Sequence, residues 1–118
     1  MYIYLLMPKT IKKNVSEPWF SLIKCNLKKV EGRLCKGDFS KLEKGDIIIW
    51  TNNEMGFKRQ FSTKVTRINE YRDFKEYLEV ETLKKCLPGI DSLQQGLSIY
   101  YKYFTKAQEK QFNVVALG

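Results

Sequence analysis

The stretch that decides the fold runs from Pro18 to Trp50 and reads PWFSLIKCNLKKVEGRLCKGDFSKLEKGDIIIW. From Trp19 to Ile23 the apolar residues recur at intervals of about three and four, which places them on one face of an α-helix. Asn26 follows where this pattern stops, and asparagine tolerates the left-handed conformation that ends many helices. The sequence therefore predicts a short apolar helix that ends near Asn26.

After this helix the pattern changes to the alternation of a β-strand. Val30 and Leu34 fall on one face of the predicted strand. Glu31 and Arg33 fall on the opposite face. Lys28 lies at the corner between helix and strand, where its long side chain can reach over the face of Glu31. These three charges form either a functional site or ion pairs on a solvated surface, worth at most ~1 kcal/mol.

The segment NLKKVEGR at 26–33 resembles the signature Gly-x-Lys-x-x-Glu-x-Arg of the ASCH domain family. Lys28, Glu31 and Arg33 match three of its four fixed positions, and an asparagine replaces the glycine. The apolar helix before the motif and the strand after it resemble the corresponding segments of that family. Several later segments do so as well. The resemblance extends over nearly the whole chain, from about residue 19 to residue 117.

This resemblance implies a fold and two possible activities. The fold would be α+β, a small PUA-like β-barrel with flanking α-helices, built as a single ASCH-like domain over residues 1–118. The family is associated with RNA binding. Some small members resemble amidohydrolases that deacetylate N4-acetylcytidine, and this implies Lys28 and Glu31 as catalytic residues. For the carboxylate that assists later in the chain, the candidates are Glu79 and Glu81.

Binding of RNA or of a modified nucleoside is the interpretation that the charges favour. Lys28 and Arg33 would contact a phosphate or a base edge, and Glu31 would accept a hydrogen bond from an exocyclic amine or fix Arg33. Catalysis is the more demanding interpretation, because a chain without histidine would have to use a lysine as the base. Such a lysine must have a pKa far below the ordinary value of about 10.4. The amidohydrolase is thus the alternative, and docking to another protein is a third possibility. The candidate nucleic-acid-binding residues are Lys28, Lys29, Arg33, Lys24 and Lys36.

The charge of the chain points to an anionic partner. Its 118 residues carry a formal net charge of +8. Residues 1–45 hold 10 basic and 4 acidic side chains, whereas residues 46–118 hold 11 and 9. A basic surface of this kind attracts polyanions such as RNA. The excess is greatest around the motif, although a lysine-rich composition could also arise without a functional reason.

Metal and membrane functions are disfavoured by the composition. The chain has no histidine, and its 3 cysteines show no C-x-x-C spacing, which excludes the usual zinc sites. We expect no metal and no other cofactor. Cysteine usage of this kind is typical of a reducing compartment, so we expect an intracellular protein of the cytoplasm or nucleus. The apolar run at residues 1–7 is too short to span a bilayer and reads as a first strand.

The remaining elements are predicted from periodicity, capping signals and turn residues. We expect a polar connection over 9–16, strands over 47–50, 58–68 and 113–117, and helices starting near residues 73, 83 and 91. Short sequential strands joined by turns favour a small barrel over a parallel sheet. The last strand would close this barrel against the first.

Overall fold

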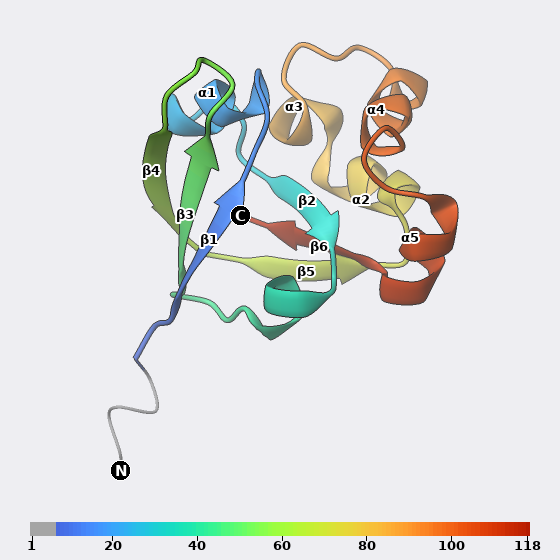
Figure 1. Ribbon diagram of the computed structural model, residues 1–118. Coiled ribbons are helices and arrows are strands. Elements are labelled where there is room, and N and C mark those ends of the chain that lie inside the picture. Colours follow the sequence, from blue (N-terminus) through green and yellow to red (C-terminus); the bar gives the residue numbers. More distant parts are fainter. Residues whose placement is uncertain (1–6) are drawn as a thin grey trace.

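The computed structural model describes residues 7–118, which form an α+β fold of two small sheets and flanking helices (Figure 1). The strands are β1 (Thr10–Asn14), β2 (Glu31–Leu34), β3 (Ile47–Asn52), β4 (Arg59–Lys64), β5 (Ile68–Tyr71) and β6 (Val114–Leu117). The helices are α1 (Trp19–Lys24), α2 (Phe74–Glu81), α3 (Leu83–Cys86), α4 (Leu93–Tyr100) and α5 (Lys106–Phe112), with a 3₁₀ helix, η2 (Gly37–Lys41). The predicted α+β class is confirmed.

Each sheet has three strands. The first has the order β1-β3-β4, with β1 parallel and β4 antiparallel to β3. The second has the order β2-β6-β5 and is antiparallel throughout. Among residues 7–118 these sheets do not close into a barrel, so the barrel predicted from the short strands is not found there. The last strand, β6, pairs with β2 on one edge and with β5 on the other. It therefore has no free edge with which to pair with the first sheet and close a barrel. The strand predicted over 1–7 falls almost wholly outside the described residues.

The polar connection predicted over 9–16 is wrong, because β1 occupies most of it. Its residues pair with β3 from Thr10 opposite Ile47 to Asn14 opposite Thr51. Ile11 packs against the core, while the alternate residues are exposed. The partner strand thus imposes an extended conformation on a lysine-rich segment with weak strand propensity.

The single strand predicted over 58–68 is two strands that belong to different sheets. β4 pairs with β3, and β5 pairs with β6. Between them, the amide of Val65 donates to the Asp46 carbonyl and the amide of Thr66 donates to the Gly118 carbonyl. The chain therefore crosses from one sheet to the other at these two residues.

Two apolar cores meet at β6. The core under α2 and α4 includes Phe74, Leu78 and Val114. The core between α1 and the first sheet includes Trp50 and Val115. All four residues of β6 are buried because successive side chains of a strand point to opposite sides. Among the helices of residues 7–118, none is long and apolar enough to cross a membrane.

Candidate functional site

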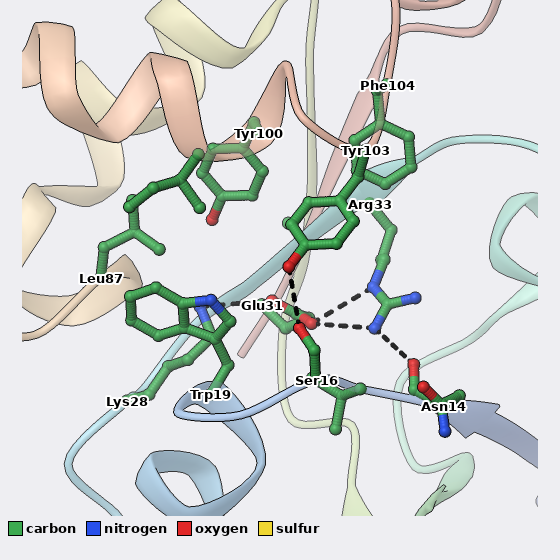
Figure 2. Close-up of a pocket in the computed structure, with 13 residues that line it drawn as sticks. Asn14, Ser16, Trp19, Lys28, Glu31, Arg33, Leu87, Tyr100, Tyr103 and Phe104 are labelled. Atoms are coloured by element: carbon green, nitrogen blue, oxygen red, sulfur yellow. Dashed lines mark hydrogen bonds and ion pairs between the residues drawn. The ribbon is translucent and has the colours of Figure 1, made fainter. Parts of the chain in front are cut away.

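The structure brings the three charges of the motif together (Figure 2). The Lys28 Nζ lies 3.2 Å from Glu31 Oε1. The other oxygen, Glu31 Oε2, accepts from Arg33 Nε at 3.2 Å and from Arg33 Nη2 at 3.1 Å. The side chains of Lys28 and Glu31 are only 1% and 11% exposed. The alternative of solvated surface charges is therefore wrong for this pair.

The turn after α1 places Lys28 in this position. Asn26 has a φ of 64°, which confirms the predicted left-handed residue at the end of the helix. The amides of Leu27 and Lys28 then both donate to the Leu22 carbonyl at 2.9 Å, so the chain folds back over the helix end. The next two amides, of residues 29–30, donate to the Lys85 carbonyl and fix the entry into β2 against α3.

The ammonium group of Lys28 is fully occupied by the protein. It donates to the Val30 carbonyl at 2.8 Å, to the Cys86 carbonyl and to Glu31. A lysine ammonium has three hydrogens, so these acceptors leave none for a ligand. The Nζ also lies 5.6 Å from the centre of the Trp19 ring. Lys28 therefore has no hydrogen to donate to a ligand and instead holds the Glu31 carboxylate in position.

Glu31 is an ionised acceptor in this site. Burial opposes its ionisation, but the charges of Lys28 and Arg33 outweigh burial and hold the pKa of Glu31 below its usual value. A carboxylate offers about four acceptor positions, and three are taken by Lys28 and Arg33. Counting donors from residues 7–118, one position, on Oε1, is left for a donor from a ligand.

Arg33 links the carboxylate to the surface. Besides Glu31, its Nη2 donates to the Asn14 carbonyl at 2.9 Å. The guanidinium lies 5.4 Å from the ring centres of both Phe39 and Trp50. Within residues 7–118, Nη1 has no acceptor, and the side chain is 20% exposed. This nitrogen is free to contact an anion.

A cavity of about 320 Å³ opens beside the three charges. Within residues 7–118, four aromatic residues line it: Trp19, Tyr100, Tyr103 and Phe104. Tyr103 is 58% exposed, and its hydroxyl lies 3.1 Å from the hydroxyl of Ser16, so two loops meet across the cavity (Figure 2). Aromatic walls around a carboxylate suit a flat ligand that carries a hydrogen-bond donor.

At the inner wall of the cavity, a tyrosine pair and a glycine pack against each other along β2. The hydroxyls of Tyr77 and Tyr100 lie 3.0 Å apart, and burial raises the pKa of both, so both hydroxyls are neutral. A Cβ at Gly32 would lie 2.5 Å from Cζ of Tyr77. The sequence analysis gave Gly32 no role in the site, although a glycine between the two charged residues of the strand was an available signal.

The other predicted RNA-binding lysines lie on the surface. Lys24, Lys29 and Lys36 are all exposed. Lys36 lies over the ring of Phe112, with Nζ 5.3 Å from the ring centre. None of the three lines the aromatic cavity, although Lys29 lines a second cavity described below.

The structure does not bring either later carboxylate to the aromatic cavity. Glu79 is exposed on α2. Glu81 is buried and accepts from Arg67 at 2.8 and 2.6 Å and from Tyr71 at 2.5 Å. The Arg67 hydrogen bond is the main cause of a pKa of about 2 for Glu81. Neither residue lines the cavity.

The cysteines and acidic residues do not gather into a metal site. Residues 7–118 contain no group of three or more His, Cys, Asp or Glu side chains placed to hold a metal ion. Cys35 directly follows β2, and its Sγ lies 3.6 Å from Oε1 of Glu70. Burial and this carboxylate raise the pKa of the Cys35 thiol, so it is not activated as a nucleophile.

Comparison with known proteins places the site in a family context. The family model of the ASCH domain matches residues 14–118. The crystal structure of hypothetical protein PH0355 superposes with a TM-score of 0.81 at 34% sequence identity, covering 92% of this chain and 94% of that chain. The solution NMR structure of protein PF0455 from Pyrococcus furiosus gives a TM-score of 0.72 at 32% identity, with coverage of 92% and 93%. A search of curated proteins found no significant match.

Proposed function

Because this chain belongs to the ASCH domain family, which is generally linked to RNA binding, we propose that the aromatic cavity holds one unpaired nucleotide of an RNA strand. A free modified nucleoside would make the contacts of the base alone. The two sheets and their helices would then be an open variant of the PUA-like fold.

One observation carries this proposal: a cavity with aromatic walls ends on a carboxylate that has one vacant acceptor position. A volume of about 320 Å³ lies at the lower end of the ~300–1,000 Å³ typical of small-molecule sites. Aromatic rings stack on the faces of unpaired bases. The vacant position on Glu31 would accept a hydrogen from an exocyclic amine or ring nitrogen of the base.

The rim of the cavity supports a nucleotide over a neutral ligand. The Arg33 side chain is 20% exposed, and its Nη1 has no acceptor within residues 7–118, so this nitrogen is available to a phosphate. Arginine forms short, charge-assisted hydrogen bonds with phosphate oxygens. The base would thus enter the cavity while its phosphate stays at the surface.

The occupied ammonium of Lys28 favours binding over deacetylation. A catalytic Lys28 would have to lose a proton that it shares with Glu31 and two backbone carbonyls. Glu79 and Glu81 are not at the cavity to assist it. We therefore place RNA binding first and hydrolysis of an acylated nucleoside second.

A direct test compares single-stranded with double-stranded RNA of the same sequence by fluorescence anisotropy. An A-form duplex keeps its bases stacked and its major groove closed to side chains, so it cannot insert a base. We expect the single strand to bind and the duplex to compete poorly. Equal binding of both forms would show that only the backbone is recognised and would contradict the cavity as the binding site.

The enzymatic alternative is tested separately. Wild-type protein is incubated with N4-acetylcytidine, and the products are followed by mass spectrometry. We expect no cytidine above the level formed in buffer alone. Cytidine release by the protein would overturn the ranking and make the cavity a catalytic site.

A further inference from the structure

A second cavity lies next to the first and shares only the Lys28–Glu31 ion pair with it. It also measures about 320 Å³. Of the lining residues of the two cavities, Lys28 and Glu31 alone occur in both. The ion pair is therefore a common wall between the two cavities.

The walls of the second cavity are apolar and its rim is basic. Buried side chains from both sheets and the intervening chain form the walls: Val30, Ile48, Trp50, Val65 and Leu117. At the rim, Lys29 and Lys64 are exposed, and neither forms an ion pair within residues 7–118. Glu31, already paired with two cations, is the only carboxylate side chain among the lining residues that the structure describes. The charge of this cavity therefore suits an anion.

Hydrogen-bond donors are also available there. The indole of Trp50 donates to Oγ1 of Thr63 at 2.9 Å. The Thr63 hydroxyl thus uses a lone pair for the indole and keeps its own hydrogen for a ligand. Apolar walls, a hydroxyl donor and two cations at the rim match a nucleotide, which has a flat base and a charged phosphate.

We propose that the second cavity binds the nucleotide adjacent to the one in the aromatic cavity, so that the Lys28–Glu31 pair separates two neighbouring bases of one RNA strand. This inference rests on the proposed function. Consecutive nucleotides are covalently joined, so two sites with a common wall are close enough for a dinucleotide whose bases are splayed apart. Lys29 and Lys64 contact the second phosphate.

The two tryptophans of the chain make the test specific, because each lines one cavity. Trp19 lines the first and Trp50 lines the second. The variant Trp50→Phe reports on the first cavity by its single tryptophan, and Trp19→Phe reports on the second. Circular dichroism checks that both variants are folded.

Each variant is titrated with the mononucleotides 5′-AMP and 5′-CMP and with the dinucleotides pApA and pCpC. We expect at least one base type to quench Trp19 as the mononucleotide and both tryptophans as the dinucleotide. The dinucleotide should bind about tenfold more tightly or better, because its second contact is intramolecular. If the dinucleotide quenches only Trp19 and binds no more tightly, the second site is wrong and the proposed function stands. If no ligand quenches Trp19, the proposed function and this inference both fail.

Charge reversal at the rim gives an independent readout. In Lys29→Glu/Lys64→Glu we expect the dinucleotide to lose its advantage over the mononucleotide. The matched control, Lys41→Glu/Lys44→Glu, has the same net charge, and its altered residues are exposed and line neither cavity. If both variants lost this advantage equally, the cause would be long-range electrostatics, and the proposed second site would be wrong.

Discussion

The ammonium of Lys28 lies 3.2 Å from the carboxylate of Glu31 in the wall between two cavities. All three ammonium hydrogens face protein oxygens, whereas the carboxylate keeps one acceptor position vacant. In the motif, the lysine thus supports the glutamate, and the glutamate faces the ligand. This division of roles separates the proposed binding site from a lysine-based enzyme.

Replacing Lys28 should destabilise the fold strongly. In Lys28→Met the carbonyls of Val30 and Cys86 lose their donor and Glu31 loses a buried counter-charge. Breaking a buried ion pair typically costs about 3–5 kcal/mol, and we expect a loss of that order in the free energy of unfolding, measured with urea. The exposed neighbour provides the control, since Lys29→Met should change stability by less than about 0.5 kcal/mol. Similar values for the two variants would contradict the role of Lys28.

A methyl group at position 32 should disturb the site through Tyr77. In Gly32→Ala the new Cβ would lie 2.5 Å from the Tyr77 ring, which is fully buried and cannot move freely. Overpacking of this kind costs about 1–3 kcal/mol. A double-mutant cycle with Tyr77→Ala checks the cause: in that background Gly32→Ala should cost little. An undiminished cost would show that another neighbour is responsible.

The stability of the protein should fall in acid because of Glu81. Its pKa is about 2 in the folded protein against a usual 4.5, chiefly because Arg67 donates to it. A carboxyl with a lowered folded pKa stabilises the fold above pH 4.5 and loses this contribution as the pH falls towards 2. The contribution is on the order of 3 kcal/mol. Unfolding curves between pH 2 and 6 should show this slope, and Glu81→Gln should make it shallower, while Glu31, whose pKa is also lowered, keeps part of it. If Glu81→Gln kept the full slope, another carboxyl would be the source.

RNA affinity should depend on salt through Arg33. Each phosphate contact on single-stranded RNA contributes about −0.7 to the slope of log affinity against log salt. We expect Arg33→Met to lower the magnitude of the slope by about 0.7. Arg72 serves as the control because it is 78% exposed and lines neither cavity, so Arg72→Met should leave the slope unchanged. Equal slopes in wild type and Arg33→Met would show that Arg33 contacts no phosphate.

The motif could be predicted from sequence because its geometry is local. The alternation of β2 places Glu31 and Arg33 on one face, and the left-handed Asn26 returns the chain so that Lys28 joins them. Both features depend on a few adjacent residues. The charge cluster therefore follows from spacing alone.

What the sequence could not predict depends on distant partners. The strand at Thr10–Asn14 exists because β3 pairs with it, and no local signal in a lysine-rich segment shows that partner. The burial of Lys28 likewise depends on the Cys86 carbonyl, from a helix far along the chain. Tyr100 has the same helical pattern whether it fills a core or lines a cavity. In the structure it does both, because it packs in the core under α2 and α4 and also lines the aromatic cavity.

The central claim is that a base of single-stranded RNA stacks in the aromatic cavity, and the affinity of the Tyr103→Ala variant tests it most directly. Tyr103 and Phe57 are both 58% exposed, but only Tyr103 lines the cavity, so Phe57→Ala is a matched control. Loss of a stacking ring costs about 1–3 kcal/mol, or about 5- to 150-fold in affinity. We expect a loss in this range for Tyr103→Ala and none for Phe57→Ala. Equal affinity of the two variants for single-stranded RNA would contradict the account.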